Sequence, residues 1–233
     1  MHQNEFFMKK NNNTNTQLAS IEEGLTKTEQ FIEDNSKSLS LLIGFIIILF
    51  IGIFCYSNLY IKPLNQSAQD KLFIVEQYFE KNQFTEALNG TDEFDGLLSI
   101  IENYSNTESA KLARYYAGIS FMNIGNFEEA IKTLENYKSK DKLLLSIAKM
   151  NIGDAFLELN QPKEAIEYYN KSLSIVKNNL ITPITLMKCA TIYEQEEDYN
   201  SALNYYEQIK IDYPNSNIAL SIDKYISKVK IKS

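Results

Sequence analysis

Histidine, arginine and tryptophan are almost missing from this chain. Of its 233 residues, one is a histidine (His2), one is an arginine (Arg114) and none is a tryptophan. Histidine is the commonest general base and a common metal ligand, so its near absence removes both kinds of site. The chain also has no glycine-rich phosphate loop and no nucleophile elbow. We therefore expect no enzyme, no catalytic residues, no cofactor and no metal site.

Cysteine and positive charge are also scarce. Cys55 lies inside an apolar run, which leaves Cys189 alone in the polar part of the chain, so no disulfide can form there. Cys189 fits the role of a small core residue. The 23 basic and 30 acidic residues give a formal charge of -7. No basic patch with interleaved aromatic residues is present, which argues against nucleic acid as a partner.

A pattern of small and large apolar residues recurs along the second half of the chain. One copy has Gly118, Phe121, Gly125, Ala130 and Leu134, and the next has Gly153, Phe156, Asn160, Ala165 and Tyr169. A third copy has Ala190, Tyr193, Ala202, Tyr206 and Pro214, and a weaker one has Val75, Tyr78 and Ala87. Apolar residues at three- and four-residue steps predict a pair of short amphipathic helices in each copy.

The small residues of this pattern predict close helix contacts. A glycine inside a helix costs roughly 1 kcal/mol, so Gly118 and Gly153 are expected where a neighbouring helix comes very near. Gly125 and Asn160 supply the turns between the two helices of a pair, with Gly125 permitting a positive φ. A single helix pair cannot bury its apolar face, so the copies must stack.

These residues resemble the tetratricopeptide repeat family, whose repeats of about 34 residues have small, aromatic and proline positions in this order. The resemblance implies an all-α solenoid of about three to four helix pairs with a C-terminal capping helix. We place this domain over residues 61–233, with repeats near 68–104, 111–144, 146–179 and 183–216 and the cap over 217–232. An interruption over 89–96 and a short helix after it enlarge the first repeat.

Leu39 to Tyr60 predicts a transmembrane helix. Its centre, Leu41 to Cys55, has no charged or polar side chain, and the whole segment covers about 30 Å at 1.5 Å per residue. A cleaved signal peptide would start nearer the N-terminus and end in small residues, whereas this run ends in Phe54, Cys55 and Tyr56. The preceding residues, 1–38, are polar and are expected to be a partly disordered cytoplasmic tail.

Orientation depends on a small difference in charge. Lysines flank the span on both sides, with a slight excess before it: Lys9, Lys10, Lys27 and Lys37 against Lys62, Lys71 and Lys81. A short tail, one span and a large domain are typical of a signal anchor. We therefore expect a single-pass protein of the bacterial inner membrane, with the N-terminus in the cytoplasm and the repeats in the periplasm.

The family resemblance also implies a binding groove, lined by the first helix of each pair. The family positions fall on Phe73, Glu76, Phe79, Tyr115, Ile119, Met122, Asn123, Met150, Asp154, Leu157, Met187, Thr191 and Glu194. Glu80, Glu158 and Gln195 belong to the same face. Such a lining is apolar and acidic, and it lacks the cations that clamp a peptide carboxylate. Each of these side chains has an alternative role, which is to pack on a neighbouring repeat.

The layout of tail, span and acidic repeat domain is similar to the ancillary subunit of the bacterial Sec translocon. The similarity is to its Bacteroidetes-like version, through Leu112–Gly118, Ser139–Phe156 and Thr182–Tyr193. It implies translocon subunits, a periplasmic folding factor and exported polypeptides as partners, and a role in binding or escorting polypeptides. The alternative is a scaffold for an envelope or cell-division complex that binds one defined partner.

Overall fold

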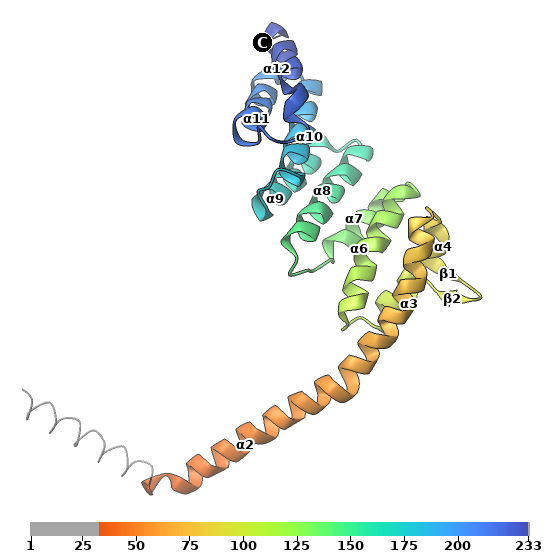
Figure 1. Ribbon diagram of the computed structural model, residues 1–233, viewed down its shortest axis with the longest axis vertical. Coiled ribbons are helices and arrows are strands. Elements are labelled where there is room, and N and C mark those ends of the chain that lie inside the picture. The colour runs from red at the N-terminus through yellow and green to blue at the C-terminus, as the bar shows by residue number, and fades with distance from the viewer. Residues whose placement is uncertain (1–32, 233) are drawn as a thin grey trace, which may run out of the picture. The chain divides into compact units, whose positions relative to one another are not determined.

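The computed structural model describes residues 33–232, and nearly all of them are helical (Figure 1). The chain divides into two compact units between Tyr60 and Ile61. The predicted all-α class is confirmed. Most of the polar tail expected over 1–38, including His2, lies outside the described residues.

The first unit contains the apolar helix α2 (Ser36–Cys55), followed by a π-helical turn, η1 (Tyr56–Ile61). None of the side chains of α2 is buried, and Leu41, Ile48 and Phe54 expose about two thirds or more of their surface. A helix satisfies its own backbone hydrogen bonds, as a lipid environment requires. The helix that begins at Ser36 is long enough and apolar enough to cross a membrane.

The second unit is a solenoid of stacked helix pairs. Among the described residues the pairs are α3 (Lys62–Glu80) with α4 (Phe84–Asn89), α6 (Glu108–Asn123) with α7 (Phe127–Glu135), α8 (Lys142–Glu158) with α9 (Pro162–Ile175), and α10 (Ile181–Gln195) with α11 (Tyr199–Asp212). A short 3₁₀ turn, η2 (Ala219–Ser221), leads into the last helix, α12 (Ile222–Lys232). Each pair packs on the next along the stack (Figure 1).

The turn inside each pair has the same backbone geometry four times. Its left-handed residues are Asn82, Gly125, Asn160 and Glu197, with φ values of 59°, 78°, 58° and 62°. The amide of the following residue donates to the carbonyl of an aromatic residue five positions back: Tyr78, Phe121, Phe156 and Tyr193. This bond is part of the Schellman arrangement that closes a helix C-terminus. The positive φ predicted at Gly125 is confirmed.

Gly118 and Gly153 lie where the second helix of each pair comes closest to the first. A Cβ atom on Gly118 would lie 2.4 Å from Cγ of the buried Leu134. On Gly153 it would lie 2.5 Å from the ring of the buried Tyr169 and 3.1 Å from the carbonyl oxygen of Ala165. The close approach predicted for both glycines is therefore confirmed.

The first repeat contains an insertion that the sequence did not identify as a hairpin. Strands β1 (Gly90–Thr91) and β2 (Phe94–Asp95) pair antiparallel, and helix α5 (Leu97–Asn103) follows. The ring of Phe94 stacks on Tyr78 with centroids 4.3 Å apart, and Lys71 on α3 pairs with Asp95. These contacts fasten the hairpin to α3. Two residues per strand are too few to give an alternating sequence pattern.

Helix α12 closes the end of the solenoid that follows α11. Its buried side chains, Ile222, Ile226 and Val229, join a core with Ala202 and Tyr206 of α11.

Cys189 is fully buried in α10, and burial raises the pKa of its thiol to about 12. A thiol with so high a pKa is unreactive, in agreement with the core role predicted for it.

Candidate functional site

A hollow of about 420 Å³ lies between α6 and α8. Three of the predicted groove residues, Ile119, Met122 and Asn123, line it from α6, and Phe127 lines it from the start of α7. From α8 come Glu158, which the sequence had placed on the groove face, and Asn151, which it had not. The hollow therefore combines apolar surface with two amides and one carboxylate. Amide side chains both donate and accept hydrogen bonds, as a peptide backbone does.

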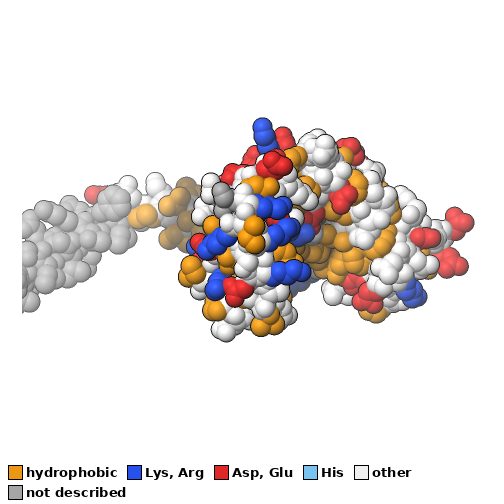
Figure 2. Space-filling view, turned by 90° about the horizontal axis from the view of Figure 1, so that it is seen from above, with side chains coloured by type: hydrophobic (Ala, Val, Ile, Leu, Met, Phe, Trp, Pro, Cys, Tyr) orange, Lys and Arg blue, Asp and Glu red, His pale blue; other side chains and the backbone are white. Residues whose placement is uncertain are grey.

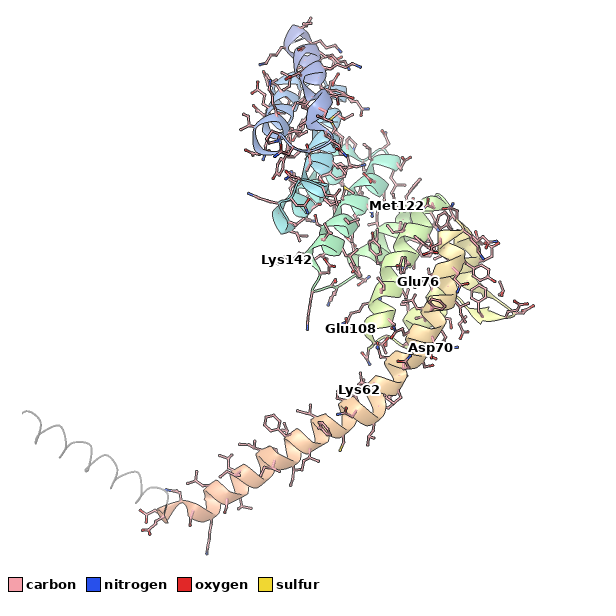
Figure 3. All side chains as sticks on the ribbon, in the orientation of Figure 1. Lys62, Asp70, Glu76, Glu108, Met122 and Lys142 are labelled. Atoms are coloured by element: carbon pink, nitrogen blue, oxygen red, sulfur yellow. The ribbon has the colours of Figure 1, made fainter. Side chains whose placement is uncertain are left out.

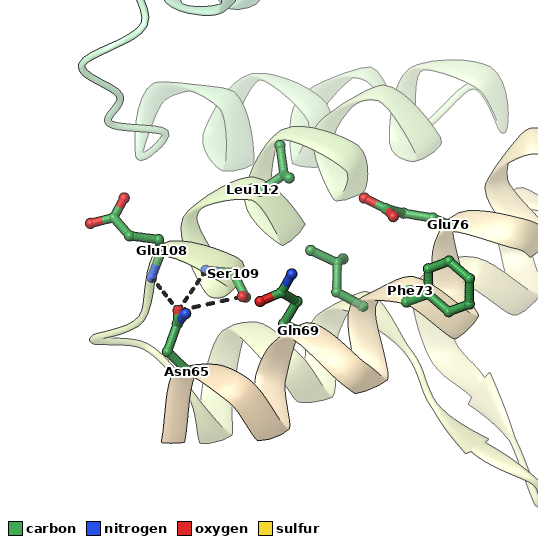
Figure 4. A pocket seen from close by; sticks show the side chains of 8 residues that line it. Asn65, Gln69, Phe73, Glu76, Glu108, Ser109 and Leu112 are labelled. Carbon is green, nitrogen blue, oxygen red and sulfur yellow. Dashed lines mark hydrogen bonds between the residues drawn. The ribbon is translucent and has the colours of Figure 1, made fainter. Parts of the chain in front are cut away.

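A second hollow, of about 320 Å³, lies between α3 and α6 (Figure 4). Asn65 closes one end of it. The Oδ1 atom of Asn65 accepts hydrogen bonds from the backbone amides of Glu108 and Ser109, at 3.1 and 3.4 Å, and from the Ser109 hydroxyl. These amides belong to the first turn of α6, where backbone donors lack helical partners. Asn65 therefore fixes α3 to the start of α6.

The other end of this hollow contains Phe73 and Glu76, both predicted groove residues (Figure 4). Figure 3 shows the place of Glu76 on α3. Apolar walls come from Leu72 and Leu112, and the Phe73 side chain is 63% exposed. The hydroxyl of Tyr116 on α6 lies beside the Glu76 carboxylate. Burial, together with this carboxylate, raises the pKa of Tyr116 to about 12. The hollow is thus an apolar cleft with a single carboxylate held at its edge.

Asp154 on α8, a third predicted groove acid, is engaged inside the solenoid. Its Oδ1 atom accepts a hydrogen bond of 2.6 Å from the hydroxyl of Tyr169 on α9. The ammonium of Lys188 on α10 lies 2.8 Å from the same oxygen. Burial, and secondarily the neighbouring Asp154, raise the pKa of Tyr169 far above its ordinary range. A lysine of the following pair therefore neutralises Asp154.

Glu194 on α10 repeats this arrangement one pair further along. It accepts a hydrogen bond of 3.1 Å from the hydroxyl of Tyr206 on α11, and it pairs with Lys228 on α12. Its side chain is only 12% exposed. The hydrogen bond from Lys228 lowers the pKa of the Glu194 carboxyl below its ordinary value of 4.5. Glu194 therefore ties the cap to the last repeat.

This arrangement predicts that the last repeat loses stability in acid. Because the folded state lowers the Glu194 pKa, the ion pair contributes fully above about pH 4.5 and is lost as pH falls through the lower, folded-state value. We expect the urea midpoint of unfolding to fall with pH below about 4.5, and Glu194→Gln to flatten that fall. Glu196→Gln, an exposed neighbour, is the control. Equal pH profiles for wild type and Glu194→Gln would contradict the assignment.

Several predicted groove residues lie mainly in helix contacts. Phe79 packs on Tyr116 with ring centroids 4.9 Å apart, and Tyr115 packs on Tyr137 at 5.4 Å. Met150 and Met187 lie half-buried against core clusters of the later repeats. The hydroxyl of Thr191 donates a hydrogen bond of 2.9 Å to the carbonyl of Met187. Leu157, by contrast, is 38% exposed.

Sequence reasoning missed the residues that complete the two hollows. These are Asn65, Gln69, Leu72, Glu108, Ser109 and Leu112 around the first helix pair, and Phe127 and Asn151 in the middle of the stack. Most of them occupy helix positions outside the family's groove pattern. For Asn65 one signal was present, because an Asn side chain is a strong helix cap, but the helix it caps begins 43 residues later.

Lysines gather at the end of the solenoid that carries α12 (Figure 2). Lys210 pairs with Asp223 at 2.6 Å, and Lys230 pairs with Glu207 at 2.9 Å. Within residues 33–232 no group of three or more acidic, cysteine or histidine residues could hold a metal ion. Three carboxylates of the last repeat and the cap, Glu194, Glu207 and Asp223, therefore serve in ion pairs with lysines.

Comparison with known proteins supports the repeat assignment. Family models of the tetratricopeptide repeat match residues 112–141, 147–179 and 185–216. A similar solved structure is a variant of the nearly identical TPR-like repeats of a protein named as a kinesin light chain, from Podospora anserina. It is 14% identical, with a TM-score of 0.54 over 72% of this chain and 87% of that one, which shows the fold alone. No curated protein matches the chain.

The three matched segments are consecutive helix pairs of the solenoid. Tetratricopeptide repeats bind other proteins, and proteins built from them are typically non-enzymatic scaffolds. The chain therefore contains a protein–protein interaction module. Its two hollows lie between the first helices of successive pairs, on the elements for which the sequence predicted a groove.

Proposed function

We propose that this chain is a membrane-anchored module that binds or escorts polypeptides in the periplasm beside the Sec translocon. The observation that carries the proposal is the pair of open hollows along α3, α6 and α8, in which apolar walls stand beside amides and carboxylates. Such surfaces suit extended polypeptide, because apolar side chains and backbone groups both find partners. Six of the groove residues predicted from the sequence would supply part of this contact surface: Phe73, Glu76, Ile119, Met122, Asn123 and Glu158.

The anchor in this proposal is the span 39–60, within the apolar, uncovered α2 and the turn η1, and the repeat domain is 61–233. Exposed apolar side chains on every side of a helix are suited to lipid and unfavourable in water. With the N-terminus in the cytoplasm, the span would hold the repeats against the outer face of the bacterial inner membrane. A module at that place would meet exported chains as they leave the translocon, and it could pass them to a periplasmic folding factor.

Site-specific crosslinking tests the proposal. A photoreactive amino acid replaces Met122, in the hollow between α6 and α8, and the control position is the exposed Lys163 on α9. We expect translocon subunits or exported polypeptides to be captured from position 122 in intact membranes and not from position 163. Capture of neither class from position 122, or equal capture from both positions, would contradict the proposal.

The orientation has its own measurement. Alkaline phosphatase fused after Ser233 is active only outside the cytoplasm, so we expect an active fusion. An inactive fusion that is stably made would place the repeats on the cytoplasmic side and remove the export role.

A static scaffold for an envelope or cell-division complex is the second candidate. The observation in its favour is that Asp154 and Glu194 are both neutralised by lysines of the following helices, which makes the later repeats a fixed surface. A fixed surface suits one defined partner better than many. Capture of a single stoichiometric partner from position 122, with no exported chains, would favour the scaffold.

A further inference from the structure

Three carboxylates on the first helices have a tyrosine hydroxyl of another helix beside them. Tyr169 hydrogen-bonds to Asp154 and Tyr206 hydrogen-bonds to Glu194, and Tyr116 lies beside Glu76. In the two later repeats the hydrogen bond orients the acid. The tyrosine supplies no charge, so a partly buried carboxylate still needs a cation to offset its lost hydration.

For two of the three acids, the chain supplies that cation itself. Lys188 reaches Asp154 and Lys228 reaches Glu194, each from the first helix of the following pair or from the cap. Each lysine lies 34 residues after the acid with which it forms an ion pair. In the later repeats, Asp154 and Glu194 are therefore each neutralised by a lysine of a following helix.

For Glu76 no lysine or arginine among the described residues lies within ion-pair distance. Two lysines of α3 and α6 are engaged elsewhere: Lys71 pairs with Asp95, and Lys111 pairs with Glu108 at 2.7 Å. Asp154 and Glu194 face a lysine, whereas Glu76 faces the hollow between α3 and α6 (Figure 4). The acid thus has Tyr116 beside it and is open on the side of the hollow.

We infer that the hollow beside Glu76 binds a lysine or arginine side chain of a polypeptide partner, with an apolar residue of the same segment on Phe73. This inference rests on the proposed function and names the kind of segment that the groove prefers. The cation takes the place that Lys188 and Lys228 take for Asp154 and Glu194. Its aliphatic stem packs along Leu72 and Leu112, and its charged end meets Glu76.

The shape and charge of the hollow favour this occupant over an acidic or purely apolar segment. The lining residues include the acids Glu76 and Glu108 and no lysine or arginine, so an acidic segment would be repelled. A purely apolar segment would cover Glu76 without offering it a partner, which carries a desolvation penalty. Phe73, 63% exposed, offers both an apolar contact and a ring face for a cation.

The test uses the full-length protein in lipid nanodiscs and a phage library of random dodecapeptides, depleted first on empty nanodiscs. We expect the selected peptides to contain lysine or arginine next to a large apolar residue. A synthetic copy of the most enriched peptide should bind Glu76→Gln about tenfold more weakly than wild type, the loss of one charge-assisted hydrogen bond. Glutamine keeps an oxygen that can accept from Tyr116. Glu102→Gln, an exposed α5 variant with the same change of charge, should stay within about twofold.

A change on the peptide provides the second measurement. Replacing its basic residue by methionine should weaken binding to wild type by a similar factor and leave Glu76→Gln unaffected. Selected peptides without basic residues, or equal binding to wild type and Glu76→Gln, would overturn the inference and leave polypeptide binding intact. A library that yields no peptide, together with no crosslinks from position 122, would instead contradict the proposed function.

Discussion

Two arginines in place of Ile47 and Ile48 are expected to release the chain from membranes. Both side chains lie near the middle of α2 and are about half exposed or more, with no protein neighbour to shield a charge. An arginine at the centre of a membrane helix costs roughly 2.5–3.5 kcal/mol on insertion scales, so two should prevent most insertion. The measurement is alkaline extraction of membranes, with the protein followed in pellet and supernatant.

The matched control places the same two substitutions on the repeats. Ile211 and Leu220 are 72% and 86% exposed, and Ile211→Arg with Leu220→Arg should leave the protein in the pellet. Wild-type protein that moves into the supernatant at alkaline pH would show that α2 is no membrane span. In that case its exposed apolar surface would need a protein partner, because isolated apolar helices of this length do not stay in water.

Removal of the Tyr169 side chain is expected to have the largest effect on the solenoid itself. The ring is fully buried between α8, α9 and α10, and it fills the space that Gly153 leaves open. Tyr169→Ala should lower the free energy of unfolding by about 3–5 kcal/mol, the range for large aromatic side chains in cores. Tyr169→Phe should lower the free energy of unfolding by about 1–2 kcal/mol, because it removes only the hydroxyl that donates a hydrogen bond to Asp154.

Urea unfolding followed by circular dichroism measures both variants, and Tyr168→Ala is the control. Tyr168 is the preceding residue of the same helix, and it is only partly buried, against Phe156 and Lys171. Its loss should cost clearly less than that of Tyr169. Equal destabilisation by the two alanine variants would contradict the claim that the buried ring of Tyr169 contributes more to stability than the partly buried ring of Tyr168.

The repeat architecture could be predicted because it depends on residues whose role is local or periodic. Gly118 and Gly153 are tolerated only at a close contact, and Gly125 fits a left-handed turn wherever it occurs. Aromatic residues at Phe121, Phe156 and Tyr193 recur at the spacing of the helix ends. Such features need no knowledge of the next repeat, so the sequence alone identifies the helix pairs and their turns.

The partners of the polar groove residues could not be predicted in the same way. Asp154 and Glu194 have sequence positions typical of an open groove, yet lysines 34 residues later neutralise them. Whether such a lysine reaches the acid depends on how far one pair rotates on the next, which no local pattern specifies. The same holds for Asn65, whose hydrogen bonds end on a helix 43 residues away. Composition therefore predicts that the groove face is acidic, but it does not predict which of its carboxylates lack a lysine partner.

The contacts between repeats differ in which partner comes first along the chain. Lys188 and Lys228 complete acids that precede them, whereas Asn65 supports a helix that follows it. Chains fold from the N-terminal side while they are being made. During synthesis α6 can therefore start on a ready-made cap, but Asp154 and Glu194 have no lysine partner until α10 and α12 have emerged. A ribosome that pauses between Asp154 and Lys188 would thus hold a partly finished solenoid with an open charge, a natural place for a chaperone to act.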